Sequence, residues 1–500
     1  MSDYTWLVDS AGREPHAYRG VLLSFVALFC NANTKFNRGG YDMAREFDAI
    51  VIGTGQAGPS LAGRLTAAGW KVAVIERKLF GGTCVNTGCI PTKTLVASAR
   101  AAYMARRAGD YGVTIDGDVG VDMKRVKARK DEVSGFSNKN VEKWLKSMEN
   151  STVYEGHARF EGPNTVAVNG ELLNAEKIFI NVGARAHIPP LRGLDEVPYL
   201  TNSSMMEVDF LPEHLVIIGG SYIGLEFAQM YRRFGSEVTV IEMAPRVIMR
   251  DDPDISQAVR EILEAEGVNI RLDAECLELH KIGDRVVANV RCDKGAPTVE
   301  GTHLLLAAGR TPNTDDLGLE KAGVEVDERG NIVVDDELRT NVPGIWALGE
   351  CNGRGAFTHT SYNDFEIVAA NLLDNDRRRV SDRIVCYGLF IDPPLGRVGM
   401  TEEEVRKSGR DALVAKMAMK RVGRARERSE TEGFMKVLVN AETKEILGAA
   451  ILGIEGDEAV HCIIDIMYAK APYTVIQRAV HIHPTVSELI PTLLGGLKPL

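Results

Sequence analysis

The sequence predicts an α/β fold that contains two Rossmann-like dinucleotide-binding domains. One pattern occurs twice, as AIVIGTGQAGPSLAGRLTAAGWKVAVIE at 49–76 and as LVIIGGSYIGLEFAQMYRRFGSEVTVIE at 215–242. Within each copy the order is an apolar strand, a glycine-rich turn, an amphipathic helix, a glycine, and a second apolar strand ending in glutamate. The chain of 500 residues, 45% of them apolar, has material for about three domains.

Each glycine-rich turn is predicted to hold the pyrophosphate of a dinucleotide. Backbone N–H groups at the start of the following helix can donate to phosphate, and the terminal carboxylate can accept hydrogen bonds from ribose hydroxyls. The positions are Gly53, Gly55, Gly58 and Glu76 in the first copy, and Gly219, Ser221, Gly224 and Glu242 in the second. Because Ser221 stands where a glycine is usual, its Cβ is expected to crowd the second pyrophosphate; the alternative is that its hydroxyl bonds the phosphate. The alternative is that the glycines only form tight strand–helix turns.

The segment GGTCVNTGCIPTK at 81–93 places Cys84 close to Cys89 in a chain with eight cysteines. In a regular helix this spacing would separate the two residues by ~7.5 Å along the axis, whereas a disulfide requires Cα atoms no more than about 7 Å apart. The backbone must therefore depart from regular helix, with Gly88 supplying conformational freedom and Pro91 suiting the first turn of the next helix. A disulfide there would be reducible, which favours catalysis; two unrelated core cysteines remain the alternative.

Composition and charge narrow the class of protein. A net charge of −10 argues against a nucleic-acid or anionic-membrane partner, because both need a positive field. Scattered cysteines are typical of a reducing compartment, so we predict a cytoplasmic protein. No metal site is predicted. The basic stretch KRVGRARER at 420–428 is interpreted as a solvated loop or face.

The amino-terminal region contains the apolar run VLLSFVALFC at 21–30, which mimics the core of a signal peptide. The run is too short to span a bilayer, and bulky Phe29 precedes Cys30 where a cleavage site would need small residues. We therefore expect residues 1–43 to be an N-terminal extension that the fold does not need.

Taken together, these motifs resemble the class I pyridine nucleotide-disulfide oxidoreductases, the family of glutathione reductase, dihydrolipoamide dehydrogenase and mercuric reductase. Further similar segments are LLLAAGRTPNT at 304–314, GIWALGECNGRGAFTHTSYNDFEIVAANLL at 344–373 and HIHPTVSELIP at 481–491. The resemblance implies FAD in the first unit, NAD(P)H in the second and a C-terminal α+β dimerisation domain. The implied boundaries are 44–190 for the first part of the FAD-binding domain, 191–312 for the NAD(P)-binding domain, 313–382 for the second FAD-binding part and 383–500 for the dimerisation domain.

By this resemblance Cys89 is the sulfur nearest the flavin, and Cys84 is the interchange thiol that attacks the substrate. His483 is the implied proton-transferring imidazole and Glu488 is placed to orient it, with His481 as the nearest competitor. The bond between His483 and Pro484 is expected to be cis. The resemblance also implies a homodimer in which the histidine segment completes the neighbouring subunit's active site.

The remaining implied residues surround the two cofactors. Lys93 is expected to pair with Glu226 beneath the flavin, and Tyr222 to form an aromatic lid over the nicotinamide; ordinary surface charges and a core tyrosine are the alternatives. Glu350 stands where the family usually has aspartate. The other implied cofactor-binding residues are Gly82, Thr83, Gly183, Gly309, Arg310, Thr358 and His359.

The implied reaction passes electrons from NADH through FAD to the Cys84–Cys89 disulfide and then to a small disulfide substrate. NADH is expected over NADPH because Glu242 would repel a 2′-phosphate, although Arg246 could counter this. A mercuric-reductase-like metal-ion reductase is the alternative enzyme, disfavoured because Cys462, the last cysteine, stands alone. A flavin-binding subunit without enzymatic activity is the third hypothesis.

Overall fold

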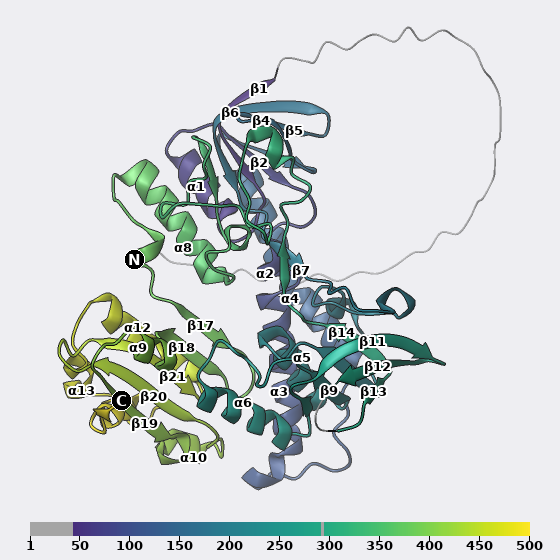
Figure 1. Cartoon of the computed structure of the whole chain (residues 1–500), viewed down its shortest axis with the longest axis vertical. Coiled ribbons are helices and arrows are strands. Elements are labelled where there is room, and N and C mark those ends of the chain that lie inside the picture. The colour runs from purple at the N-terminus through teal and green to yellow at the C-terminus, as the bar shows by residue number, and fades with distance from the viewer. Residues whose placement is uncertain (1–43, 292–294) are drawn as a thin grey trace, which may run out of the picture. The chain divides into compact units, whose positions relative to one another are not determined.

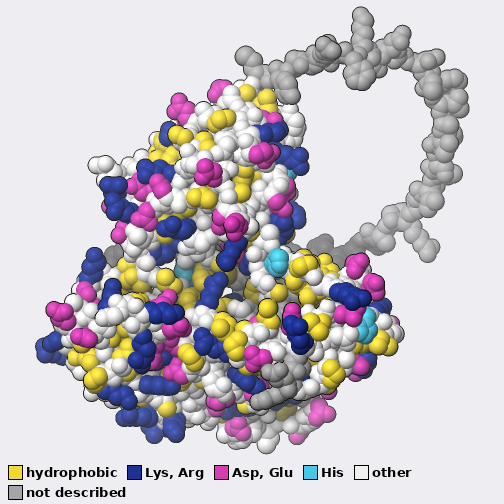
Figure 2. Space-filling model, in the orientation of Figure 1, with side chains coloured by type: hydrophobic (Ala, Val, Ile, Leu, Met, Phe, Trp, Pro, Cys, Tyr) yellow, Lys and Arg dark blue, Asp and Glu magenta, His cyan; other side chains and the backbone are white. Residues whose placement is uncertain are grey.

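The computed structural model describes residues 44–291 and 295–500. The apolar run at 21–30 and the predicted extension lie outside the described residues. Among the residues described, no helix combines the length and the apolarity needed to cross a bilayer. Figure 2 shows acidic and basic side chains intermixed over the visible face of the molecule.

The first sheet is parallel at its centre and carries the first copy of the repeat (Figure 1). Its strands are β1 (Arg45–Ile52), β2 (Val72–Glu76), β3 (Ser151–Glu155), β4 (Arg159–Gly162), β5 (Thr165–Val168), β6 (Glu171–Ile180) and β16 (Ile345–Ala347). Their order is β3-β2-β1-β6-β5-β4, and β16 pairs with β6. The associated helices are α1 (Gly58–Ala67), α4 (Met123–Ser147) and α8 (Thr358–Ala369). Because β16 comes after the whole second unit, the chain returns to this sheet.

The second sheet is parallel and carries the second copy. Its strands are β8 (His214–Ile218), β9 (Glu237–Ile241), β10 (Asn269–Arg271) and β14 (His303–Leu306), in the order β10-β9-β8-β14. Its helices are α5 (Tyr222–Phe234) and α6 (Pro253–Ala265), and a three-stranded antiparallel sheet is formed by β11 (Glu275–Ile282), β12 (Arg285–Arg291) and β13 (Thr298–Gly301). The register repeats as well: Val51 lies opposite Val74 in the first copy, and Ile217 lies opposite Val240 at the equivalent positions of the second.

The C-terminal part is α+β, built on a six-stranded sheet. Its strands are β17 (Cys386–Leu389), β18 (Leu395–Gly399), β19 (Ala412–Ala418), β20 (Phe434–Asn440), β21 (Ile446–Leu452) and β22 (Lys498–Pro499), in the order β17-β18-β21-β20-β19-β22. Its helices are α9 (Glu402–Lys407), α10 (Gly423–Glu427), α11 (Gly456–Ala459), α12 (His461–Tyr468), α13 (Thr474–Arg478) and α14 (Ile490–Leu494). The predicted α/β fold with two Rossmann-like units and a C-terminal α+β domain is thus confirmed.

The basic stretch at 420–428 corrects one sequence interpretation. It contains the short helix α10, and the side chains of Val422 and Ala425 are fully buried. The prediction of a solvated loop or face is therefore wrong for these two residues. The abundant charges of this stretch conceal two apolar positions that the C-terminal core requires.

Helices α2 (Gly82–Asn86) and α3 (Cys89–Arg106) carry the cysteine pair, and α3 packs against both α4 and α5. The short strands β7 (Ala184–Ala186) and β15 (Arg310–Pro312) pair with each other, and α7 (Leu319–Ala322) follows them. Because α3 contacts helices of both Rossmann-like units, the cysteine segment is placed where the two units meet.

A buried ion cluster joins these helices to the C-terminal sheet. Arg233 of α5, with a side chain only 4% exposed, pairs with Glu266 at 2.7 Å and also with Asp392 in the loop after β17. Arg100 of α3 pairs with the same Asp392 at 2.5 Å and with Glu430 at 2.6 Å. The two Rossmann-like units and the C-terminal sheet therefore share one set of charges, in which Arg233 is buried and Arg100 is about one third exposed.

Replacing Arg233 with methionine should lower the free energy of unfolding by about 3–5 kcal/mol, because it leaves the Glu266 carboxylate without its cation and Asp392 with only one of two. Arg260→Met is the matched control, since Arg260 pairs within helix α6 with Glu264 at 2.8 Å and both side chains are about one third exposed. This exposed pair should contribute less than about 1 kcal/mol. Urea unfolding of both variants measures the difference, and equal losses would contradict the prediction.

Candidate active site

The helix is interrupted between the two cysteines, as their spacing predicts. Cys84 lies in α2 and Cys89 begins α3, while the intervening Gly88 has φ −131° and ψ −116°. A Cβ added to Gly88 would lie 2.9 Å from the carbonyl oxygen of Thr83, so a larger residue does not fit without a shift of the backbone. Both cysteines are present as thiols. The turn brings them together without requiring a regular helix.

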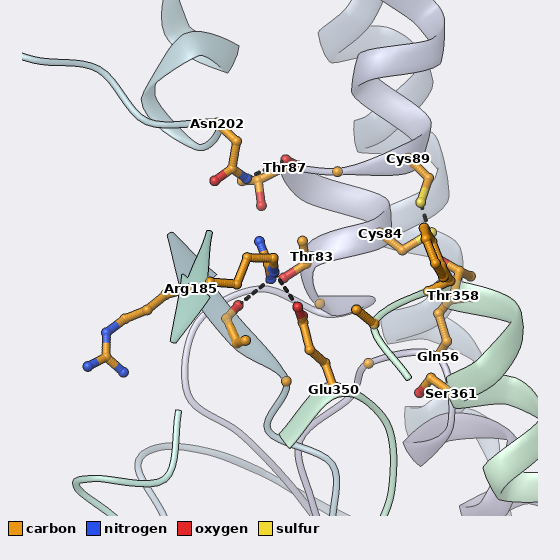
Figure 3. Close-up of a pocket in the computed structure, with 18 of the residues that line it drawn as sticks. Gln56, Thr83, Cys84, Thr87, Cys89, Arg185, Asn202, Glu350, Thr358 and Ser361 are labelled. Atoms are coloured by element: carbon orange, nitrogen blue, oxygen red, sulfur yellow. Dashed lines mark hydrogen bonds and ion pairs between the residues drawn. The ribbon is translucent and has the colours of Figure 1, made fainter. Parts of the chain in front are cut away.

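The two thiols have opposite shifts in pKa. The hydrogen bond from Cys84 lowers the pKa of Cys89 to about 6, with help from the Thr358 hydroxyl and the Lys93 ammonium group. The same hydrogen bond, together with burial, raises the pKa of Cys84. The Cys89 sulfur lies 3.1 Å from Thr358 Oγ1 at the start of α8 (Figure 3). These shifts favour a thiolate on Cys89 and a proton on Cys84.

Lys93 and Glu226 form the ion pair that the resemblance implies. Lys93 Nζ donates to Glu226 Oε2 at 2.8 Å, and Glu226 Oε1 accepts the backbone N–H of Phe390 at 3.0 Å. The ammonium group also lies 4.4 Å from the centre of the Phe390 ring. Since Glu226 is buried, this contact fixes the cysteine helix α3 against α5 and against the loop after β17.

Glu76 and Glu242 are oriented in the same way in the two repeats. Glu76 Oε2 accepts the backbone N–H of Thr54 at 3.0 Å, and Glu242 Oε2 accepts that of Gly220 at 2.6 Å. In each copy the other carboxylate oxygen accepts the N–H two residues further on, at 2.9 Å and 2.8 Å. Each glutamate is therefore held at the mouth of its glycine-rich turn.

The departure at Ser221 has a structural explanation. Asn181 follows β6, the strand beside β1, and a Cβ at Gly55 would lie 2.9 Å from its Oδ1 atom. Ala307 follows β14 at the equivalent place in the second sheet and has no amide side chain. The Asn181 side chain therefore leaves no room for a Cβ at position 55. In the second copy Ala307 leaves space for the side chain of Ser221. Sequence reasoning missed Asn181 because no local pattern marks it.

One cavity of about 1220 Å³ collects most of the predicted residues. Its lining includes Gly53, Gly55, Glu76, Gly82, Thr83, Cys84, Cys89, Lys93, Gly183, Ser221, Tyr222, Glu226, Gly309, Arg310, Glu350, Thr358 and His359. The predicted residues outside this lining are Gly58, Gly219, Gly224, Glu242, His483 and Glu488. The lining also contains Gln56, Asn181, Asn202, Phe357, Cys386 and Tyr387, which sequence reasoning did not select.

The cavity fits an extended dinucleotide such as FAD. Its volume exceeds the roughly 300–1,000 Å³ of sites for drug-sized ligands. The Glu76 carboxylate accepts the Thr54 N–H in the first glycine-rich turn, and the two thiols lie in the same cavity. At Gly183 an added Cβ would meet no atom within 4 Å, so this glycine borders open space. A glycine-rich turn, a carboxylate and two thiols therefore line one cavity.

Glu350 lines the cavity and also forms an ion pair with Arg310. Arg310 Nε donates to Glu350 Oε1 at 2.5 Å, and Arg310 Nη2 donates to the carbonyl oxygen of Ala184 at 2.6 Å. The extra methylene of Glu350, compared with aspartate, is accommodated by this ion pair. Arg310 thereby connects the 3₁₀ turn at Glu350–Asn352 to strand β7.

The predicted lid residue Tyr222 is tethered by its hydroxyl group. Tyr222 donates to Asp251 Oδ2 at 2.9 Å, and Tyr387 donates to Asp251 Oδ1 at 3.2 Å. The two rings meet edge to face with centroids 5.6 Å apart. Burial raises the pKa of Asp251. Neither Asp251 nor Tyr387 carries a sequence signal, since both contacts span more than twenty residues.

His483 and Glu488 are paired, but away from the thiols of the same chain. His483 Nδ1 lies 2.9 Å from Glu488 Oε2, and the His483 side chain is 79% exposed. The peptide bond to Pro484 is cis, as predicted. Val480 and Ile482 beside it are also exposed. The competitor His481 faces the carbonyl oxygen of Ala479 at 3.3 Å. Because Nδ1 faces the carboxylate, Nε2 of His483 is the nitrogen available to another group.

Within 44–291 and 295–500, no three His, Cys, Asp or Glu side chains are grouped so that they could hold a metal ion.

Comparison with known proteins gives matches over most of the chain. Residues 47–364 match the family described as pyridine nucleotide-disulphide oxidoreductase, and residues 385–494 match the dimerisation domain of that family. The probable pyridine nucleotide-disulfide oxidoreductase RclA of Escherichia coli (strain K12) is 38% identical over 91% of this chain and 100% of the relative. A dihydrolipoyl dehydrogenase of Cupriavidus necator is 32% identical over 90% of this chain and 97% of the relative. A mercuric reductase of Bacillus cereus is 33% identical over 85% of this chain and 67% of the relative.

Solved structures agree with these matches. The HOCl-induced flavoprotein disulfide reductase RclA from Escherichia coli superposes with a TM-score of 0.82 at 37% identity, covering 90% of this chain and 99% of that one. A Cu(II) complex of the same reductase has a TM-score of 0.82 at 37% identity, covering 89% and 99%. The chain therefore belongs to the pyridine nucleotide-disulphide oxidoreductase family, whose members are FAD- and NAD(P)H-dependent oxidoreductases that act on sulfur groups.

Proposed function

We propose that this chain passes electrons from NADH through FAD to a Cys84–Cys89 disulfide and then to a small disulfide substrate. The observation that carries the proposal is the thiol pair itself, in which the pKa of Cys89 is lowered while that of Cys84 is raised. The pair lies in the same cavity as the Lys93–Glu226 ion pair and the first glycine-rich turn. A thiol pair with only core-packing duties would not need a charged partner at this site.

Bound FAD would accept a hydride from NADH and supply the electron pair that opens the disulfide. The remaining steps are thiol–disulfide exchanges carried out by the protein's cysteines. Cys84, once deprotonated, attacks one sulfur of a substrate RSSR, forms a Cys84–SR mixed disulfide and releases RS⁻. The Cys89 thiolate then attacks the Cys84 sulfur, re-forms the intramolecular disulfide and releases the second RS⁻. With one proton from solution, NADH and RSSR become NAD⁺ and two RSH.

The raised pKa of Cys84 requires a base, because a protonated thiol is a poor nucleophile. We propose that His483 of the partner subunit supplies it, accepting the Cys84 proton and later donating it to a departing thiolate. Within one chain His483 is exposed and does not line the cavity, and exposed Val480 and Ile482 flank it. The matched dimerisation domain supports a homodimer in which this exposed segment is covered.

Metal-ion reduction is the second candidate, because one of the superposed RclA structures is a Cu(II) complex and mercuric reductases are among the relatives. Thiolates at Cys84 and Cys89 would bind soft metals. Disulfide reduction is favoured because His483 and Glu488 form a proton-transferring pair, which metal reduction does not need.

Purified holoenzyme should oxidise NADH faster with oxidised lipoamide or oxidised glutathione than with Hg(II) or Cu(II) in excess thiol. Cys84→Ser and Cys89→Ser should abolish disulfide turnover. Cys462→Ser is the matched control and should retain it, because Cys462 lies outside the cavity lining. NADH absorbance measures all the rates. Sustained metal-dependent turnover without disulfide turnover would overturn the proposed substrate class.

Mixed dimers should recover activity if each site is shared. Cys84→Ser and His483→Ala homodimers should both be inactive, but a hybrid dimer has one site without either lesion. After random exchange about a quarter of wild-type activity should return, since half of the dimers are hybrids and each has one intact site. Mixing Cys84→Ser with Cys89→Ser is the control, because every site then lacks one thiol. No recovery in the first mixture, despite demonstrated exchange, contradicts a shared site.

We propose a preference for NADH over NADPH, because the Glu242 carboxylate is held at the second turn and would repel a 2′-phosphate. Arg246 instead donates to its own loop, at the carbonyl oxygen of Met249. Glu242→Gln should narrow the NADH/NADPH ratio of kcat/KM by about tenfold, the equivalent of ~1.4 kcal/mol. Glu237→Gln makes the same charge change at an exposed position of β9 and should leave the ratio unchanged. A wild-type preference for NADPH would refute the assignment.

A further inference from the structure

The basic stretch at 420–428 takes no part in the function proposed above, yet it contacts the histidine segment. Arg424 Nη2 donates a hydrogen bond to the carbonyl oxygen of Pro484 at 2.6 Å. Arg424 Nη1 lies 3.3 Å from Glu427 Oε2 on the same short helix, α10. Since Pro484 directly follows His483, the guanidinium group links α10 to the backbone beside the imidazole.

Helix α10 is a fixed support for this contact. Val422 and Ala425 are fully buried, and they belong to the same apolar cluster as Val486 and Ile490. Those two residues follow the histidine in the chain. The apolar residues at α10 and the segment after His483 therefore share one core. Arg424 adds a hydrogen bond between them, to the carbonyl oxygen of Pro484.

The side chains before the histidine are exposed, although the Ile482 carbonyl oxygen accepts the Thr485 hydroxyl at 2.8 Å. The side chain of Ile482 is 80% exposed and that of Val480 is fully exposed. Beyond that point the backbone is held by Arg424 at Pro484, and the imidazole is held by Glu488 at Nδ1. These two polar contacts restrain different parts of the same unit: one the main chain and the other the ring.

We propose that Arg424 is a positioning residue that fixes the His483 imidazole for proton transfer, an inference that rests on the role proposed for His483. A hydrogen bond from a charged guanidinium to a carbonyl is stronger than one between neutral groups. Loss of this bond would let the backbone at Pro484 shift, and a displacement of about 1 Å at a reacting group can cost ~10²-fold in rate.

The test compares two disulfides that differ in their need for a proton. Reduction of oxidised lipoamide releases an alkyl thiolate, whereas 5,5′-dithiobis(2-nitrobenzoate) releases an acidic aryl thiol that departs readily without protonation. Arg424→Met should lower kcat with lipoamide about ten- to a hundredfold and change the aryl disulfide rate by less than about threefold. Stopped-flow reduction of the bound flavin by NADH should be unchanged.

Arg426→Met is the matched control, since Arg426 lies on the same helix and is exposed. It should behave as wild type with both disulfides. Arg424→Lys keeps a cationic donor and should restore part of the lipoamide rate. Flavin content and dimer mass confirm that each variant is assembled, and the lysine variant keeps the test decisive if the methionine variant does not fold.

A double variant separates positioning from general destabilisation. In a His483→Ala background, Arg424→Met should cause no further loss, because both changes act through one group. Equal losses with both disulfides, equality of the Arg424→Met and Arg426→Met variants, or multiplied losses in the double variant would each overturn the proposal. Full lipoamide turnover by His483→Ala alone would instead refute the role of the histidine. That measurement needs no Arg424 variant, so the two outcomes can be distinguished.

Discussion

The position of the thiol pair depends on how helix α5 binds the cysteine helix α3. Along one face of α5, Glu226 pairs with Lys93, and one turn and two turns further on Gln229 and Arg233 bind Asp392. The loop after β17 contacts both helices: the backbone N–H of Phe390 donates to Glu226 of α5, and Asp392 also binds Arg100 of α3.

This arrangement has a physical requirement. Each buried charge in the set needs its partner, because an unpaired ion away from water is costly. The charges therefore select one mutual orientation of α3, α5 and the loop, which apolar contacts alone would specify less sharply. This orientation also positions Cys89 at the start of α3 and Cys84 in the preceding helix α2.

Much of the fold could be predicted because its signals are local. The strand–turn–helix–strand pattern at 49–76 and 215–242 lies within a short window, and even its hydrogen-bond register repeats. The resemblance to a family then placed Lys93 opposite Glu226 and His483 beside Glu488, and both pairs are present. Short-range patterns and motif matches therefore suffice to predict the repeated fold and these two residue pairs.

The residues that sequence reasoning missed act across long separations. Asn181 excludes a side chain at Gly55, and Asp251 tethers a tyrosine from the C-terminal sheet. No periodicity or motif records such contacts, since each depends on two segments meeting only after the chain has folded. The misread basic stretch fails for a different reason: its charge dominates the pattern, while burial of Val422 and Ala425 determines its structure.

The single proton shared by Cys84 and Cys89 determines how the reducing power of the site responds to acidity. Because Cys89 loses its proton at a pH of about 6 while the pKa of Cys84 is raised, reduction of the disulfide at neutral pH takes up two electrons and only one proton. The midpoint potential should then fall by about 30 mV for each pH unit, and by about twice that below pH 6, where both sulfurs are protonated. Between pH 6 and neutrality the reducing power of the site therefore changes about half as steeply with pH as that of a pair of ordinary thiols.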